Sequence, residues 1–173
     1  LMGGNISVVS EQGVGTAVYF SLSFDIEGAG EAAQPQRPPH SARILDGMRL
    51  LLVEDDHFST VLAEKLFNRH GAAVRHAGDG KAALEALRAN DFDVVLMDIQ
   101  MPGMDGIEAT QAIRRGEVGA RMRRVPIVAM TAYAMRGDRE RFLEAGMDGY
   151  VSKPFDIEDL LWTIEDIVMR KVS

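Results

Sequence analysis

Short apolar runs alternate with helical patterns over most of the chain. Five such runs follow one another: Leu50 to Val53, Ala73 to His76, Val94 to Met97, Ile127 to Met130, and the pair Tyr150 and Val151. Runs with little polar alternation are typical of strands buried on both faces, and helices between them favour a parallel sheet. The pattern predicts an α/β fold, a doubly wound five-stranded parallel sheet of order 2-1-3-4-5 with five helices.

Two helices of this domain have clear apolar stripes. Phe58, Leu62 and Leu66 share one helical face, which stops before Gly71. The last helix has the stripe Ile157, Leu160, Leu161, Ile164, Ile167 and Val168. Asp156 precedes that stripe and is the expected N-cap, because its carboxylate can accept a hydrogen bond from a free backbone N–H of the first turn.

The first 25 residues have a different period. Ile6 to Val9 is strand-like, a glycine-containing turn follows, and apolar side chains then alternate with polar ones from Val18 to Phe24. This pattern predicts a β-hairpin. A lone hairpin is marginal in water, so we expect its apolar face to pack on something or to belong to a larger domain. Residues 26–47 are rich in Gly, Ala and Pro without apolar periodicity and are interpreted as a linker, which leaves 48–173 for the α/β domain.

Composition and charge narrow the function. The 173 residues suffice for one domain and a fragment. A net charge of -7 argues against nucleic acid as a partner, and no apolar run approaches the roughly 18 residues of a membrane span. The chain has no cysteine, which excludes disulfides and thiolate metal sites. We expect a cytoplasmic protein with no membrane contact by this chain.

Carboxylates follow two strands that meet at the expected crevice. Glu54, Asp55 and Asp56 follow the first run, and Asp98 follows the third. In a sheet of this order, the crevice opens at the carboxyl ends of strands one and three. Each like-charged pair at about 5 Å costs roughly 3 kcal/mol at an effective dielectric of 20, so the cluster favours a bound cation. Oxygen ligands without His or Cys suit Mg²⁺.

A hydroxyl and an ammonium are expected at the same edge. Thr131 ends the fourth run and Lys153 follows the fifth. Each residue alone also has an ordinary interpretation, because acids often cap helices and a lysine is often a surface charge. Together they are the groups that phosphoryl transfer uses: a carboxylate that attacks phosphorus, and cationic or hydroxyl groups that bind the equatorial oxygens.

Three segments resemble the receiver domain of two-component response regulators, in the form common among hybrid sensor histidine kinases. They are LLVEDD (51–56), VVLMDIQMPGMDGIEA (94–109) and VPIVAMTAYAMRGDRERFLEAGMDGYVSKPF (125–155). The resemblance implies a flavodoxin-like fold and a role in phosphorelay signal transduction. It implies a histidine kinase core and a His-containing phosphotransfer domain as partners, with a homodimer as a further possibility.

The resemblance also implies a role for each matching residue. Asp98 becomes the phosphoacceptor, and Asp55 and Asp98 bind Mg²⁺ together with the backbone carbonyl of Gln100. Glu54 acts on the metal through water. Thr131 hydrogen-bonds to the phosphoryl group, Lys153 pairs with it, and a cis peptide precedes Pro154. The resemblance also implies a switch in which Tyr150 moves together with Thr131. Gln100 and Tyr133 control the rate of dephosphorylation.

Residues 1–24 resemble the closing strands of a histidine-kinase ATPase domain. Because the chain begins at Leu1 rather than Met, we expect this hairpin to be the end of a longer kinase. The chain lacks the ATP-binding boxes and the phosphorylated histidine of such a kinase. Whether it counts as an enzyme stays open, since a receiver catalyses only its own phosphorylation and slow dephosphorylation.

Two alternatives remain. One is a phosphatase of the haloacid-dehalogenase type, which also uses an aspartyl nucleophile but has a second Asp two residues later as general acid. Gln100 occupies that position here, which counts against turnover. The other is a stand-alone receiver that serves only for docking, against which Asp98, Thr131 and Lys153 all argue.

Overall fold

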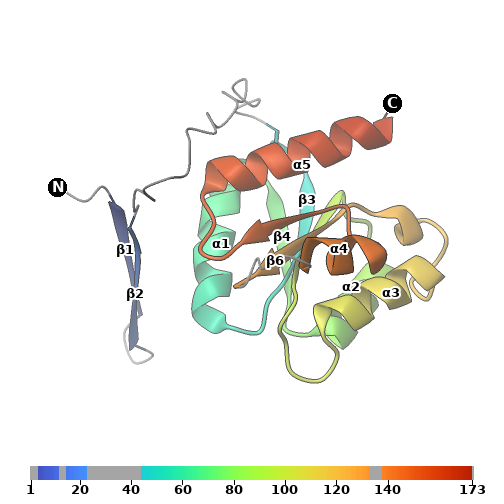
Figure 1. Cartoon of the computed structure of the whole chain (residues 1–173), viewed down its shortest axis with the longest axis horizontal. Coiled ribbons are helices and arrows are strands. Elements are labelled where there is room, and N and C mark those ends of the chain that lie inside the picture. The colour runs from blue at the N-terminus through green and yellow to red at the C-terminus, as the bar shows by residue number, and fades with distance from the viewer. Residues whose placement is uncertain (1–3, 12–14, 23–43, 133–137, 173) are drawn as a thin grey trace, which may run out of the picture.

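A computed structural model describes residues 4–11, 15–22, 44–132 and 138–172 (Figure 1). The larger sheet consists of β3 (Arg49–Val53), β4 (Ala73–Ala77), β5 (Val94–Asp98), β6 (Ile127–Thr131) and β7 (Gly149–Ser152). The helices are α1 (His57–Arg69), α2 (Gly80–Ala89), α3 (Gly106–Arg115), α4 (Asp138–Glu144), α5 (Ile157–Val172) and the short 3₁₀ helix η1 (Met122–Arg124). All neighbouring strands are parallel, in the order β4-β3-β5-β6-β7. This confirms the predicted order 2-1-3-4-5 and the doubly wound fold.

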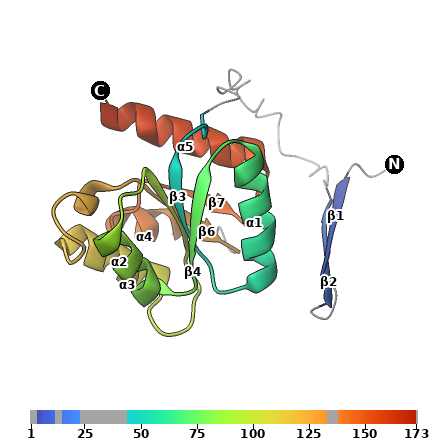
Figure 2. The same ribbon diagram turned by 180° about the vertical axis from the view of Figure 1, so that it is seen from behind.

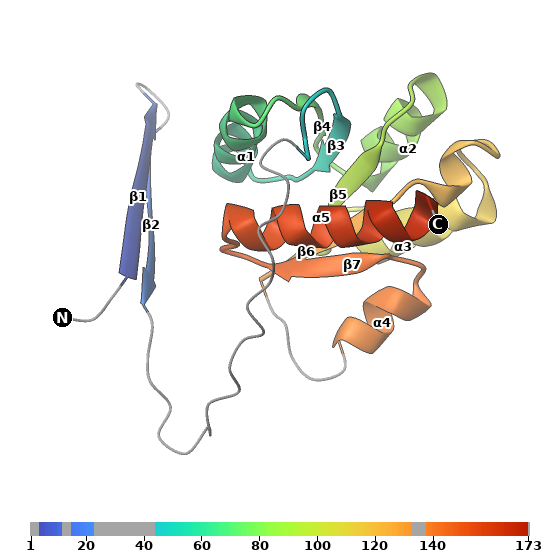
Figure 3. The same ribbon diagram turned by 90° about the horizontal axis from the view of Figure 1, so that it is seen from above.

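The sheet lies between two helical layers (Figures 2 and 3). Leu50 and Leu52 pack in one cluster with α1 and α5, whereas Leu51 and Val53 pack in the other with α2, α3 and α4. Successive side chains of a strand point to opposite faces, so a strand buried on both sides must be apolar throughout. Burying each such side chain stabilises the fold by about 1.5–3 kcal/mol, which explains why the sequence has unbroken apolar runs here.

The buried face of α1 differs from the predicted one. The side chains that α1 buries are Thr60, Ala63 and Phe67, whereas the predicted stripe that starts at Phe58 is only half-buried. Both sets recur at helical spacing, so the periodicity of the sequence does not distinguish them. The ring of Phe67 has no exposed surface and small Ala63 faces the same core cluster. Burying the larger ring determines how the helix is rotated.

Aspartates cap the helices that follow the strands. Asp56, Asp79 and Asp105 each accept a hydrogen bond from a backbone N–H in the first turn of α1, α2 and α3. Asp156 accepts one from the backbone N–H of Glu158 at 2.9 Å, which confirms it as the cap of α5. Within the ranges described, no helix has both the length and the apolar character needed to span a bilayer.

The N-terminal hairpin forms a separate sheet of two antiparallel strands. β1 (Gly4–Glu11) pairs with β2 (Gly15–Leu22), and Val8 stands opposite Val18. These two side chains are 60% and 57% exposed. The predicted hairpin is therefore present, with an apolar cross-strand pair open to solvent.

The packed α/β domain begins before the expected boundary at Met48. Residues 44–47 form a turn, and the side chain of Leu45 is buried in the core cluster of α1 and α5. The turn is held by hydrogen bonds from the N–H of Met48 to the carbonyl of Leu45 and from the N–H of Gly47 to that of Gly71, both 3.0 Å. The rest of the expected linker, 26–43, lies outside the described residues.

Candidate functional site

The strand ends bring the predicted site residues to one edge of the sheet. Asp98 is the last residue of β5 and Thr131 is the last residue of β6. Glu54 directly follows β3, and Lys153 directly follows β7. Since parallel strands all point the same way, their carboxyl ends lie together, and chemistry that is scattered over 100 positions in the sequence converges here.

Three carboxylates form a tight cluster at this edge. Glu54, Asp55 and Asp98 each offer an oxygen within 4.8 Å of the others. Glu54 and Asp98 are buried, with 3% and 6% of their surface exposed, whereas Asp55 is exposed. Buried carboxylates at this separation repel each other strongly unless a cation lies between them.

Lys153 supplies the cation among the protein's own side chains. Its Nζ lies 2.5 Å from Oε2 of Glu54 and 2.6 Å from Oδ2 of Asp98. Burial alone would lower the pKa of Lys153, but the hydrogen bonds and charges of Asp98 and Glu54 outweigh it and raise the pKa. Burial raises the pKa of Glu54 despite the ammonium beside it. One ammonium is therefore in contact with two carboxylates and does not neutralise the cluster.

Backbone contacts with the loop that follows β5 fix the position of Asp98. Its Oδ1 accepts a hydrogen bond from the N–H of Gln100 at 3.0 Å, while the side chain of Gln100 is exposed. Gly106 packs directly against it, because a Cβ at Gly106 would lie 2.1 Å from the carbonyl oxygen of Asp98. The N–H of Gly106 also donates to the carbonyl of Ile99 at 3.2 Å. The segment from 99 to 106 is thus a loop whose two ends meet at Asp98.

The acidic turn after β3 is held by groups that the sequence did not single out. Nε2 of His76, on β4, lies 2.7 Å from the carbonyl oxygen of Glu54. The hydroxyl of Thr60, on α1, donates to the carbonyl of Asp56 at 2.9 Å. Asp56 serves as a helix cap, and the hydrogen bond from the N–H of Ser59 lowers its pKa. Nothing in the spacing of His76 along the sequence reveals this contact.

The remaining predicted residues are placed as follows. Thr131 is buried, and its carbonyl accepts from the N–H of Lys153 at 2.6 Å. The peptide bond before Pro154 is cis, as expected. Tyr150 is 37% exposed and its ring centroid lies 6.3 Å from that of Phe142 on α4. Tyr133 lies outside the described residues.

The chemistry of this donor set fits a hard divalent cation. Carboxylate oxygens cluster without a sulfur or imidazole ligand among the described residues, which suits Mg²⁺ better than a softer metal. The exposed carboxylate of Asp55 gives an ion access from solvent. An Mg²⁺ ion commonly keeps several waters and takes one or two carboxylates, as the geometry here allows.

Comparisons with known proteins agree with the fold. The family profile described as the response regulator receiver domain matches residues 50–165. The chain is 42% identical over 123 residues to the sensor protein GacS of Pseudomonas syringae, an alignment that covers 71% of this chain and 13% of GacS. It is 36% identical over 175 residues to hybrid signal transduction histidine kinase I of Dictyostelium discoideum, covering 98% of this chain and 9% of that kinase.

A solved structure supports the same assignment. The receiver domain of the sensor histidine kinase PA1611 of Pseudomonas aeruginosa, with a magnesium ion in its active-site cleft, superimposes with a TM-score of 0.64 at 37% identity. The match covers 70% of this chain and 98% of that domain. The chain spans only about a tenth of the length of the two kinases above, so the comparison concerns this part of them. On the profile match, the fold and the carboxylates at its edge, this chain belongs to the receiver domain family of two-component signalling proteins.

Proposed function

We propose that the chain is the receiver of a hybrid histidine kinase that takes a phosphoryl group from a phosphohistidine onto Asp98 and passes it to a His-containing phosphotransfer domain. The observation that carries the proposal is the position of Asp98, at the end of β5 and in contact with Lys153, in a cluster of three carboxylates. In the transfer, an oxygen of Asp98 forms a bond to phosphorus as the bond from phosphorus to the histidine nitrogen breaks, and the imidazole leaves.

Mg²⁺ is the cofactor of this proposal. The carboxylates of Asp55 and Asp98 and the backbone carbonyl of Gln100 are the proposed ligands, with Glu54 acting through water. A bound Mg²⁺ neutralises negative charge on the oxygens of the transferred group. Lys153 and Thr131 then hold phosphoryl oxygens, and Lys153 gives up its contact with Asp98 to do so. The solved PA1611 receiver domain, which holds magnesium in its cleft, supports this assignment.

The hairpin is proposed to be the end of a histidine-kinase ATPase domain. Two observations support this: the match to the Dictyostelium hybrid kinase extends over 98% of the chain, and the apolar pair Val8 and Val18 is exposed. In the full kinase, further strands or helices would cover that pair. The linker that begins at residue 26 would then connect the kinase core to its receiver. This core is the proposed phosphoryl donor, in the same or another chain.

The proposed switch runs through Thr131 and Tyr150. A phosphoryl group that binds the Thr131 hydroxyl more tightly in one conformer shifts the population toward that conformer. Tyr150 lies on β7 opposite Ala129 of β6, two residues before Ser152, which pairs with Thr131, and its side chain is 37% exposed in this structure. The lifetime of the phosphorylated state is proposed to depend on Gln100 and Tyr133, two residues after Asp98 and after Thr131 in the sequence, whose side chains would limit the approach of water to the phosphoryl group.

Acetyl phosphate with Mg²⁺, followed by intact-mass measurement, tests the function. We expect one stable added phosphoryl group in the wild type and none in Asp98→Asn. Asp93→Asn is the matched control, because Asp93 pairs with Arg49 away from the site and should label normally. Steady release of phosphate would support a phosphatase, and no labelling of the wild type would support a docking module; either result would overturn the proposal.

A further inference from the structure

The carbonyl of Glu54 lies just beyond the paired part of β3 and β4, and it is hydrogen-bonded to a side chain. β3 ends at Val53, which pairs with Ala77, and the N–H of Glu54 still donates to the carbonyl of Ala77 at 3.0 Å. The carbonyl of Glu54 accepts instead from a side chain, Nε2 of His76 at 2.7 Å. The N–H and the carbonyl of Glu54 are thereby both hydrogen-bonded to residues of β4.

The partners settle which nitrogen of His76 carries hydrogen. A carbonyl oxygen can only accept, so Nε2 must donate to Glu54. Nε2 also lies 3.3 Å from the hydroxyl oxygen of Thr60, whose own hydrogen goes to the carbonyl of Asp56 at 2.9 Å. One imidazole N–H therefore contacts the start of the acidic turn directly and its end through Thr60.

We propose that His76 is a positioning residue for the metal site: it holds the turn from Glu54 to Asp56 so that the Glu54 and Asp55 carboxylates face Asp98. This inference rests on the proposed function of that site. Rotation of the peptide between Glu54 and Asp55 would move both carboxylates, and His76 is bonded to the oxygen of that peptide. The hydrogen bond from His76 holds the turn in place against the mutual repulsion of three carboxylates whose oxygens lie within 4.8 Å of one another.

The energetic role is preorganisation. A cation that must order its own ligands loses binding free energy to that ordering, whereas ligands already in place bind it more tightly. Groups behind metal ligands typically change metal affinity by 10–100-fold when they are removed. Since His76 acts on the backbone and not on a ligand atom, we expect an effect at the lower end, about tenfold.

Two variants of His76 separate positioning from general stability. His76→Leu removes the donor, while His76→Gln keeps an N–H donor at a similar reach from the backbone. His70→Leu is the matched control, because Nδ1 of His70 also contacts a backbone carbonyl, that of Leu66 at 2.9 Å, but at the far end of α1. His76 is exposed, so its replacement leaves the core intact.

Mg²⁺ dissociation constants from isothermal titration, with urea unfolding in EDTA for each variant, test the inference. We expect binding about tenfold weaker in His76→Leu, recovery to within about twofold of wild type in His76→Gln, and no change in His70→Leu. Equal Mg²⁺ affinity in wild type and His76→Leu would overturn the inference. So would equal weakening in His76→Leu and His70→Leu, which would mean that loss of stability is the cause. A wild type that does not bind Mg²⁺ would instead overturn the proposed function.

Discussion

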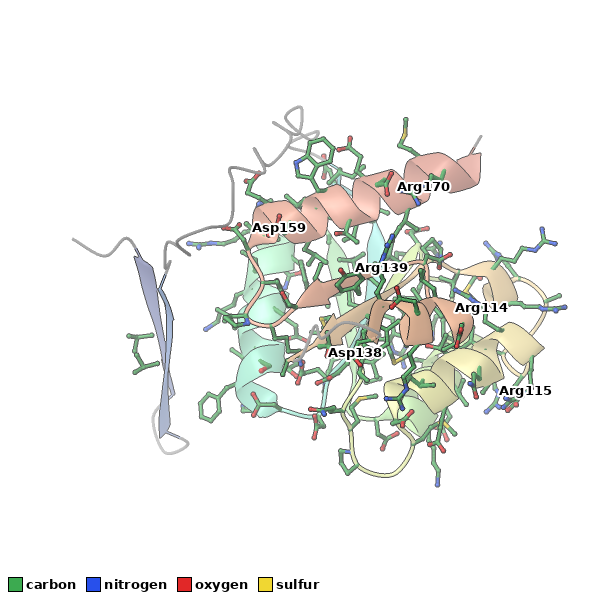
Figure 4. The ribbon with its side chains drawn as sticks, viewed as in Figure 1. Arg114, Arg115, Asp138, Arg139, Asp159 and Arg170 are labelled. Atoms are coloured by element: carbon green, nitrogen blue, oxygen red, sulfur yellow. The ribbon has the colours of Figure 1, made fainter. Side chains whose placement is uncertain are left out.

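Two ion clusters lie at opposite ends of β7, and they are built differently. Asp148 precedes the strand and binds Arg114, whereas Lys153 follows it and binds Glu54 and Asp98. Arg114 is at the end of α3, beside Arg115, on the side of the domain away from α1 (Figure 4). The guanidinium donates to three carbonyls, those of Gly146, Arg123 and Val125, at 2.8–2.9 Å, and to Asp148 at 2.9 Å.

The clusters differ in charge balance. Arg114 faces one carboxylate, whose Oδ2 also accepts from the N–H of Ile127 at 2.8 Å, so donors and acceptors match. Burial lowers the pKa of Arg114 while Asp148 opposes that shift, and a guanidinium stays charged throughout. Lys153 brings one positive charge to a cluster of three carboxylates, Glu54, Asp55 and Asp98. A balanced cluster joins loops permanently, whereas one with excess negative charge remains able to bind a divalent cation.

The largest expected effect follows from breaking the balanced cluster. Arg114→Met removes the guanidinium that donates to the Asp148 carboxylate and to three carbonyls, so we expect the free energy of unfolding to fall by about 3 kcal/mol. Urea unfolding measures this. Arg115→Met is the control, because Arg115 forms an exposed pair with Glu117 and should cost less than about 1 kcal/mol. A shift in Mg²⁺ affinity in Arg114→Met would contradict the separation of the two clusters.

Lys153→Met should destabilise the protein in a way that depends on Mg²⁺. In EDTA the variant leaves Glu54 and Asp98 facing each other without a cation, and we expect a loss of about 2 kcal/mol in the free energy of unfolding. With saturating Mg²⁺ the loss should shrink, because the ion neutralises the same carboxylates. Exposed Lys65 provides the control variant Lys65→Met. An equal loss with and without Mg²⁺ would show that the two cations do not share a site.

The difference in the free energy of unfolding between wild type and Lys153→Met depends on pH, because the pKa of Lys153 is raised in the folded protein. The folded protein holds this proton more tightly than the unfolded chain, so the stabilisation is complete below the ordinary lysine pKa of 10.5 and is lost as pH rises through the raised value. We expect the advantage of wild type over Lys153→Met in EDTA to be constant from about pH 8 to 10 and to decline above it. Urea unfolding across this range checks the sign, and an advantage that grew with pH would contradict it.

The smallest expected effect on stability comes from Asp55→Ala. Asp55 is exposed, so removing its charge from an unfilled cluster should leave the free energy of unfolding in EDTA unchanged or raise it by less than about 1 kcal/mol. Mg²⁺ binding and Mg²⁺-dependent phosphorylation should both be lost. Titration calorimetry with Mg²⁺ is the measurement, and unchanged affinity would remove Asp55 from the proposed ligands.

The sequence predicted the arrangement of the strand ends because that arrangement follows from topology alone. Once the apolar runs are parallel strands, Asp98 and Thr131 must lie at one edge, and both are indeed the last residues of their strands. Contacts that depend on side-chain reach could not be derived in this way. Lys153 and Glu54 meet across 99 positions, and His76 contacts the acidic turn from a neighbouring strand.

The rotation of α1 shows a second limit. Its sequence carries two stripes at helical spacing, and only the packing of Phe67 against the sheet decides which one is buried. The pattern of apolar positions therefore predicted the helix but not its buried face. The excess of negative charge at the site, by contrast, was visible in the residue types themselves, so the metal was predicted before any geometry was known.

The contact between Gly106 and the carbonyl of Asp98 sets how this domain can vary and be re-engineered. With 2.1 Å available to a Cβ, position 106 accepts glycine alone, so in a library of variants it should tolerate no other residue. The middle of the loop has room for side chains, because Pro102 and Gly103 are exposed and a Cβ at Gly103 would meet nothing within 4 Å. The φ of +80° at Gly103 nevertheless favours glycine there, which leaves position 102 as the open one. Position 102 is therefore the place in this loop to install a reporter group near the acceptor, because its side chain is exposed while buried Met101 and the helix cap Asp105 anchor the loop on either side.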